Sequence, residues 1–181
     1  MKLNTAMILA AGRGERMRPL TDSIPKPLLQ VQGKSLIEYH IESLKRSGYK
    51  RIIINHAWLG QQIESVLGAG ERFGLDIIYS AELQALETAG GISKALPLLC
   101  PHSEDEMFTV INGDIFTNFD FDTLPNYLPE GIKAHLVMVN NPSHNLAGDF
   151  YFEGHSLHPK QGCKLTFSGM AVYHKNFFAQ V

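Results

Sequence analysis

Apolar residues follow two alternating patterns along this chain, short continuous runs and stretches of helical spacing. The apolar runs lie within residues 6–9, 51–55, 75–80 and 107–112. Runs of this kind are typical of strands that are buried on both faces of a parallel sheet. The stretches in which apolar residues recur every three to four positions lie within residues 35–46, 59–67 and 88–96. This spacing predicts amphipathic helices between the strands.

Residues at the ends of these helices carry start and stop signals. Ser35 and Glu38 have the spacing of a capping box at the start of the first helix. Gly68 and Gly70 are expected to end the second helix, and the third is expected to end before Pro97. Strands and helices therefore alternate along most of the chain. This alternation predicts an α/β fold, a Rossmann-like open, mostly parallel sheet with helices on both faces.

The pattern changes in the C-terminal part of the chain, where short β-like pieces replace the helices. The strands expected there lie at residues 134–139, 150–153, 164–167 and 170–173. With 181 residues, no internal repeat and no linker, the chain is expected to be a single domain over residues 1–181. Within it, residues 1–130 form the α/β part and residues 131–181 form a β-rich part.

Composition narrows the classes of partner. The chain has 16 basic and 18 acidic residues and a net charge of −2, so neither nucleic acid nor a membrane surface is an expected partner. The apolar stretch after Lys2 is too short for a signal peptide, and no stretch has the length of a membrane span. Cys100 and Cys163 lie far apart and are expected to be free thiols. These features predict a cytoplasmic protein and leave its oligomeric state open.

The stretch between the first strand and the first helix is rich in glycine and arginine. Gly12 and Gly14 have no Cβ, so their backbone N–H groups can approach an oxyanion closely. Up to four cations of this stretch are expected within reach of the same charge, and these residues are Arg13, Arg16, Arg18 and Lys26. A turn with solvated arginines is the alternative, but the density of cations, with no competing salt-bridge pattern, favours a phosphate-binding loop. The spacing fits neither a P-loop nor the dinucleotide fingerprint, because Met17 stands where the third glycine would be.

An acidic side chain is expected to face this loop. Asp114 follows the run at residues 107–112, so it lies just beyond the carboxyl end of a buried strand, at the same sheet edge as the loop. A plain turn aspartate is the alternative. A carboxylate opposite a cationic loop is the minimum set of groups for Mg²⁺-assisted phosphoryl or nucleotidyl transfer, because Mg²⁺ prefers one or two carboxylates plus phosphate oxygens and water.

Three segments together resemble the sugar-phosphate nucleotidyltransferases. These segments are Gly12-Arg13-Gly14-Glu15-Arg16 with Pro19, Thr21 and Lys26, then Glu87-Thr88-Ala89-Gly90-Gly91-Ile92, and finally Asn112-Gly113-Asp114. Their order and spacing agree with that family across nearly the whole chain. The resemblance implies that an oxygen of a sugar 1-phosphate attacks the α-phosphorus of a nucleoside triphosphate, here UTP, and that pyrophosphate leaves. The alternative within this chemistry is GTP, dTTP or CTP with another sugar phosphate or with choline phosphate.

The resemblance also implies roles for single residues. Arg16 would bind the triphosphate and neutralise the departing pyrophosphate, Lys26 would bridge the reacting phosphates, and Asp114 would hold Mg²⁺. The residues whose backbone would line the nucleotide pocket are Ala10, Ala11, Gly12 and Gly14.

Contacts to the base and the sugar are expected from later segments. The residues expected near the base are Glu82, Glu87 and Gly90. Solvated charges are the alternative for the two glutamates, and a tight helix–sheet contact is the alternative for Gly90 and its neighbour Gly91. The residues expected to contact the substrate are Asn112, Asn140, Asp149, Phe150 and Gly169. A core position is the alternative for Phe150. On this basis the α/β part binds the nucleotide and the β-rich part binds the sugar.

One feature of the family is missing from this sequence. In the family, a second aspartate in a Val-Gly-Thr-like stretch near the C-terminus completes the magnesium site, and no such stretch occurs before Val181. The chain is therefore expected to be C-terminally truncated, with an incomplete sugar-binding part. A nucleotide-sugar-binding module that has lost catalysis is the alternative from another functional class.

Overall fold

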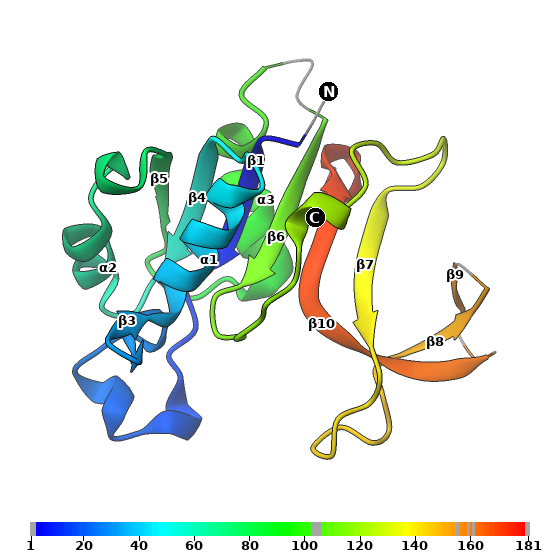
Figure 1. Ribbon diagram of the computed structural model, residues 1–181, viewed down its shortest axis with the longest axis horizontal. Coiled ribbons are helices and arrows are strands. Elements are labelled where there is room, and N and C mark those ends of the chain that lie inside the picture. The colour runs from blue at the N-terminus through cyan, green and yellow to red at the C-terminus, as the bar shows by residue number, and fades with distance from the viewer. Residues whose placement is uncertain (1–2, 103–105, 155, 159, 161, 180–181) are drawn as a thin grey trace.

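The computed structural model describes residues 3–102, 106–154, 156–158, 160 and 162–179. Its centre is a sheet in which parallel strands lie in the order β5-β4-β1-β6 (Figure 1). The bounds of these strands are Thr5–Leu9 for β1, Arg51–His56 for β4, Asp76–Ala81 for β5 and Met107–Asn112 for β6. The mostly parallel α/β sheet predicted from the apolar runs is confirmed.

Helices cover both faces of the parallel strands. α1 (Leu36–Arg46) and α2 (Gly60–Leu67) pack on one face, in a cluster that includes Ile54 of β4. α3 (Glu87–Leu99) packs on the other face, in a second cluster that includes the adjacent Ile53. Because successive strand residues point to opposite faces, a strand between two helical layers needs apolar residues at every position. This requirement explains the continuous run of isoleucines at residues 52–54 of β4.

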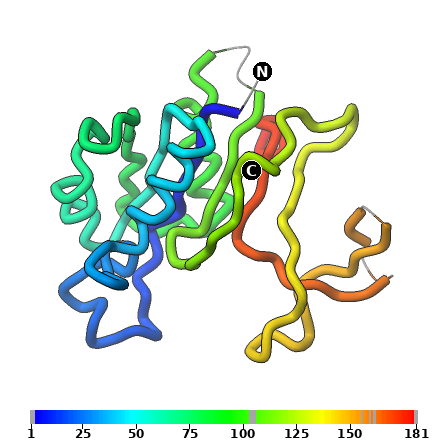
Figure 2. Tube along the Cα trace, in the orientation of Figure 1, coloured from blue at the N-terminus to red at the C-terminus, as the bar shows by residue number. Residues whose placement is uncertain are grey.

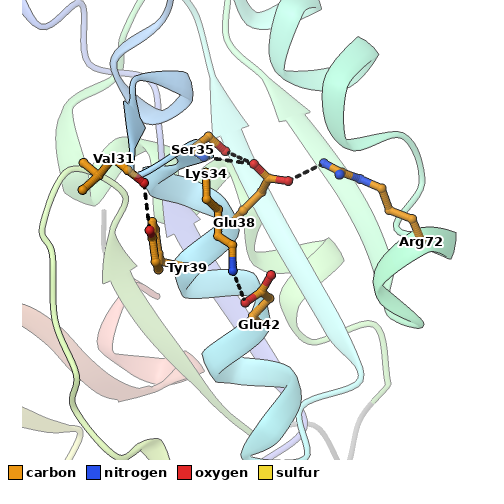
Figure 3. A network of polar contacts seen from close by, with 7 residues as sticks. All are labelled: Val31, Lys34, Ser35, Glu38, Tyr39, Glu42 and Arg72. Carbon is orange, nitrogen blue, oxygen red and sulfur yellow. Dashed lines mark hydrogen bonds and ion pairs between the residues drawn. The ribbon is translucent and has the colours of Figure 1, made fainter.

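The start of α1 is fixed by the capping box that the sequence predicts (Figure 3). The backbone N–H and the hydroxyl of Ser35 lie 3.0 and 2.6 Å from Oε2 of Glu38, and Arg72 forms an ion pair with the same carboxylate at 2.9 Å. Burial acts to raise the pKa of Glu38, but the hydrogen bonds from Ser35 and the charge of Arg72 hold that pKa below its usual value.

A hairpin that the sequence analysis did not predict leads into α1. Its strands are β2 (Gln30–Val31) and β3 (Lys34–Ser35). The Tyr39 hydroxyl donates to a β2 carbonyl at 2.8 Å, and Lys34 pairs with Glu42 at 2.7 Å (Figure 3). These contacts attach the end of the glycine-rich loop to the first helix.

The third helix continues past the proline that was expected to end it. α3 runs to Leu99 with Pro97 inside its last turn. Proline removes one helical hydrogen bond, but Leu99 is fully buried beside Phe108 in the second core cluster. Packing of Leu99 therefore favours one more helical turn than the local sequence indicates.

The C-terminal part extends the sheet with antiparallel strands. The bounds of these strands are Ala134–Val139 for β7, Phe150–Glu153 for β8, Ser156–His158 for β9 and Cys163–His174 for β10. β10 pairs with β6 and with β7, and its first residues pair with β8, so that β7, β8 and β9 stand beyond the parallel strands (Figure 1). The expectation of two short strands in the range of β10 was wrong. The register of β10 with β7 shifts between Phe167 and Ala171, and this shift does not end the strand.

Short 3-10 helices occupy several connections between these elements. Their bounds are Glu15–Met17, Leu20–Asp22, Lys26–Leu28, Glu71–Phe73, Phe121–Thr123 and Lys175–Phe177. Within the described ranges, no helix has the length and apolar character needed to cross a membrane. Cys100 and Cys163 form no disulfide in the described structure.

Candidate functional site

A cavity of about 500 Å³ opens at the carboxyl edge of the parallel strands. It lies between the loop after β1 and the segment after β6, where ligands bind in open α/β sheets. The loop after β1 is the blue segment at the lower left of Figure 2. The lining residues are Leu9 to Met17, Lys26, Pro27, Asn55, Ala85, Glu87, Thr88, Asn112 and Asp114. The structure thus brings together Arg16, Lys26 and Asp114 around one cavity.

Backbone groups of the loop after β1 form one wall of this cavity. The N–H of Ala10 donates to Oδ1 of Asn55 at 3.0 Å, which fixes the direction in which the chain leaves β1. A Cβ at Gly12 would meet no atom within 4 Å, so this backbone faces open space. Gly14 has a φ of 69°, a left-handed conformation that favours glycine. Ala10, Ala11, Gly12 and Gly14 therefore lie where a ligand in the cavity would contact the main chain.

Lys26 and Asp114 both line the cavity and form an ion pair with each other. Nζ of Lys26 lies 2.6 Å from Oδ2 of Asp114, and the two side chains are 19% and 43% exposed. These residues are 88 positions apart in sequence and come from different loops. The partial burial of Lys26 keeps its charge at the cavity wall, while Asp114 stays open to an incoming ligand.

The segment that carries Asp114 is held on both sides. Before it, the N–H of Gly113 donates to the carbonyl of Leu9 at 2.8 Å. After it, Nε2 of His40 lies 2.9 Å from the carbonyl of Ile115, an acceptor, so Nε2 carries the proton. Burial lowers the pKa of His40, which keeps the ring neutral and in this donor role near pH 7. The position of Asp114 is therefore set by the sheet and by α1.

The basic residues of the loop do not all face the cavity, which corrects the expectation that they converge on one charge. Arg18 pairs with Asp22 at 2.8 Å and is absent from the lining. Arg13 lines the cavity, but its guanidinium lies 3.6 Å from the centre of the Trp58 ring and 3.7 Å from Asp22. Asp22 thus provides the salt bridges that the sequence analysis did not expect. Arg16 lines the cavity and pairs with no carboxylate in the described part of the chain.

Asn55 is a site residue that sequence reasoning missed. It is 2% exposed at the end of β4, accepts from Ala10 and donates through Nδ2 to Oε1 of Glu82 at 2.7 Å. The other oxygen of Glu82 accepts from the N–H of Leu86 at 2.9 Å. A Cβ at Gly91 would lie 2.8 Å from both Asn55 and Glu82, so this pair requires a glycine there. An asparagine at the end of an isoleucine-rich strand was the only signal in the sequence.

The three residues expected near the base have different positions. Glu87 lines the cavity and has a φ of 59°, an uncommon conformation outside glycine and asparagine. Glu82 is 6% exposed and turns toward Asn55 rather than into the cavity lining. Gly90 is also absent from the cavity lining. It precedes Gly91, the residue that lies against Asn55 and Glu82.

Of the expected substrate residues, Asn112 lines the cavity and the others belong to the β-rich part. Gly169 abuts Asn112, since a Cβ at Gly169 would lie 2.9 Å from its Nδ2. The Asp149 carboxylate accepts from the Phe167 N–H at 2.8 Å. Phe150 is 43% exposed, which argues against the core role considered for it. Asn140 is exposed after β7, in a loop that reaches the same end of the molecule as the loop after β1 (Figure 2).

The donor set at the cavity fits a magnesium ion that is held jointly with a ligand. In the described residues, no group of three or more histidine, cysteine, aspartate or glutamate side chains is arranged to hold a metal alone. Mg²⁺ in phosphoryl-transfer sites takes one or two carboxylates and fills its remaining positions with phosphate oxygens and water. Asp114 supplies one exposed carboxylate beside the cavity, which meets the minimum of that requirement.

Comparison with known proteins agrees with this geometry. The chain matches the family described as Nucleotidyl transferase over residues 5–144 and belongs to the sugar-phosphate nucleotidyltransferases, a family of enzymes. It is 53% identical over 180 residues to the N-acetylmuramate alpha-1-phosphate uridylyltransferase of Neisseria meningitidis. This alignment covers 96% of this chain and 76% of that protein. It is also 39% identical over 127 residues to the UTP–glucose-1-phosphate uridylyltransferase of Synechocystis, in an alignment that covers 65% of this chain and 32% of that protein.

Solved structures share the fold at low sequence identity. A putative glucose-1-phosphate thymidylyltransferase from Bacillus anthracis superposes with a TM-score of 0.77 at 21% identity, over 97% of this chain and 73% of that one. The CTP:phosphocholine cytidylyltransferase of Streptococcus pneumoniae superposes with a TM-score of 0.69 at 24% identity, over 98% of this chain and 77% of that one.

Proposed function

We propose that this protein catalyses Mg²⁺-dependent transfer of the uridylyl group of UTP to N-acetylmuramate 1-phosphate in the cytoplasm. The observation that carries the proposal is the Lys26–Asp114 ion pair at 2.6 Å, which lines the same cavity as the backbone of Gly12 and Arg16. The choice of UTP and of this sugar is supported by the 53% identity to the uridylyltransferase of Neisseria meningitidis.

In the proposed reaction, a phosphate oxygen of the sugar 1-phosphate forms a bond to the α-phosphorus of UTP. The bond between that phosphorus and the oxygen bridging to the β-phosphate breaks, and pyrophosphate leaves. No protein nucleophile is needed, because such reactions depend on positioning and on charge stabilisation. Mg²⁺ at Asp114 would supply positive charge to the phosphate oxygens.

The chain's own residues have distinct roles in this proposal. The backbone of the loop after β1 holds the triphosphate, because its N–H groups can approach phosphate oxygens without a side chain between them. Arg16 neutralises the charge that builds on pyrophosphate, and the Lys26 ammonium stabilises the reacting phosphates. The Lys26 ammonium pairs with Oδ2 of Asp114 before a ligand binds. When the triphosphate binds, this ammonium would turn from the carboxylate to phosphate oxygens and leave Oδ2 of Asp114 without that partner.

We further propose that residues 1–130 bind the nucleotide and residues 131–181 contribute to the sugar site. Glu82, Glu87 and Gly90 belong to the base side of the proposed site. Asn112 lies at the border of the two parts, since it lines the cavity and contacts Gly169 of β10. The β-rich part would add the residues Asn140, Asp149, Phe150 and Gly169.

The test is pyrophosphate release by the purified chain. UTP, GTP, dTTP and CTP are each offered with N-acetylmuramate 1-phosphate, glucose 1-phosphate, mannose 1-phosphate or phosphocholine, with Mg²⁺ or with EDTA. The proposal expects the highest rate with UTP and N-acetylmuramate 1-phosphate, and none with EDTA. A higher rate with another pair would reassign the substrates. Nucleotide binding without pyrophosphate release from any pair would indicate a binding module without catalysis.

A further inference from the structure

The only tryptophan of the chain, Trp58, lies between the end of β4 and the start of α2 and contacts the loop after β1. Its indole N–H donates to the carbonyl of Thr21 at 3.0 Å, although the two residues are 37 positions apart. The face of its ring lies 3.6 Å from the guanidinium carbon of Arg13. A tryptophan that is 37% exposed thus makes two specific contacts with a loop that lines the cavity.

Thr21 transmits the first of these contacts to the cavity wall. It is 1% exposed, and its hydroxyl donates to the carbonyl of Gly14 at 2.9 Å. Its methyl group lies 3.0 Å from the place of a Cβ on Gly14, which lines the cavity in a left-handed conformation. The chain of contacts therefore runs from the Trp58 N–H through Thr21 to Gly14.

Arg13 transmits the second contact. Its guanidinium lies between the Trp58 ring and the carboxylate of Asp22, at 3.7 Å, while Asp22 also pairs with Arg18. A cation over an aromatic face is held by electrostatic attraction. Because Arg13 sits between Gly12 and Gly14, holding its side chain also restrains the peptide groups that face the cavity.

We propose that Trp58 is a positioning residue for the triphosphate. With Thr21 and Arg13 it forms a contact set, the Trp58 clasp, that holds the backbone of Gly12 to Gly14 in its cavity-lining conformation before the nucleotide arrives. A flexible glycine loop must lose conformational freedom when it binds phosphate, so ordering it in advance increases affinity. This inference rests on the proposed function only for the identity of the ligand.

The same contacts also permit an opposite role for Trp58. The two roles predict opposite changes in nucleotide affinity when the ring is removed. If Arg13 were a phosphate ligand that the Trp58 ring holds away from the cavity, removing the ring would release it and strengthen nucleotide binding. If the clasp positions the loop, removing the ring weakens binding. Arg16, which pairs with no carboxylate of the described residues, remains the cation for the phosphates in the second case.

The experiment compares Trp58→Ala and Trp58→Phe with the unaltered chain. UTP affinity is measured by calorimetry in EDTA, so that the result does not depend on turnover or on Mg²⁺. Trp58→Ala is expected to weaken UTP binding about tenfold, the size of one lost cation–π contact and one lost hydrogen bond. Trp58→Phe keeps a ring for Arg13 but lacks the N–H donor to Thr21, so an intermediate loss is expected. Tyr127→Ala, at a position that is 72% exposed, is the matched control for loss of a surface aromatic residue and is expected to bind UTP normally.

A second measurement reports on the loop without any nucleotide. Amides in this loop make turn hydrogen bonds, such as Met17 N–H to the Gly14 carbonyl and Asp22 N–H to the Pro19 carbonyl. Hydrogen exchange of peptides covering residues 13–24 is expected to become faster in Trp58→Ala, whereas exchange in β4 and β6 stays unchanged.

The outcomes separate the clasp from the proposed function. Weaker UTP binding together with faster loop exchange supports the clasp. Unchanged or tighter UTP binding overturns it, and so does weaker binding with unchanged loop exchange. If the unaltered chain binds no UTP, the proposed function fails, and inorganic triphosphate replaces UTP as the probe while loop exchange is read as before.

Discussion

The parallel and antiparallel parts of the sheet are stabilised in different ways. Every residue of β4 after Arg51 is buried, because helices cover both faces of this strand. All six residues of β7 are half-buried or exposed, and Phe150 at the start of β8 is 43% exposed. Hydrophobic burial is the largest favourable contribution to folding, so the parallel strands form the stable platform of the molecule. The antiparallel part depends more on backbone pairing with β10. The cavity lies on the platform, and the predicted sugar contacts lie mainly outside it.

The sharpest test of this division removes the charges of the cavity without touching the core. Lys26→Ala and Asp114→Ala are each expected to lower turnover about 10³-fold, because each removes a charge that stabilises the transition state in the proposed reaction. Both side chains are partly exposed, so thermal unfolding should be nearly unchanged. Lys34→Ala breaks an ion pair of similar length with Glu42 away from the cavity and is the control. Near-normal pyrophosphate release from either cavity variant would remove that residue from the mechanism.

The next test compares the two parts of the sheet directly. Ile54→Ala, at a fully buried position of β4, is expected to lower the free energy of unfolding by about 2–5 kcal/mol. Leu136→Ala, at a half-buried position of β7, is expected to cost less than about half as much, because less apolar surface leaves the interior. Urea unfolding measures both values. Equal losses would mean that the antiparallel part contributes as much core as the platform.

The smallest expected effect separates structural from ligand-facing glycines. Gly91→Ala brings a Cβ within 2.8 Å of Asn55 and Glu82, so we expect a loss of about 1–3 kcal/mol in unfolding free energy. Gly12→Ala meets no atom within 4 Å and should leave stability unchanged while weakening UTP binding. Thermal unfolding and calorimetry report the two properties separately. A stable Gly91→Ala protein would show that the Asn55–Glu82 contact can shift without cost.

The sequence predicted structure correctly where a local structural requirement selects a particular kind of residue. The apolar run of β4 and the capping box at Ser35 are such cases, and both appear in the structure as expected. Long-range partners were harder to find. Asn55 gains its role from Ala10 and Glu82, which are brought to it by three strands lying side by side. No rule for the spacing of residues along the chain predicts these contacts of Asn55 with Ala10 and Glu82.

Errors arose where tertiary packing overrode a local signal. Pro97 did not end α3, because buried Leu99 favours one more turn. β10 was expected as two strands, since Ser168 and Gly169 interrupt its apolar pattern, yet the strand runs from Cys163 to His174 and pairs with β7 on both sides of these two residues. The expectation that four cations reach one charge was too high, because Asp22 pairs with Arg18, four residues before it, and with Arg13, nine residues before it. The roles of Arg16, Lys26 and Asp114 in catalysis stay predictions.

The close approach of Gly169 to Asn112 constrains any attempt to test the proposed sugar role of the β-rich part by exchanging that part for the one of a relative. A transplanted β-rich part would bring its own residue to position 169, and any side chain there would displace Asn112, whose Cβ lies 3.1 Å from the place of the new atom. That displacement would reach the cavity that Asn112 lines. A chimera that is to keep its nucleotide chemistry must therefore retain a glycine at this junction.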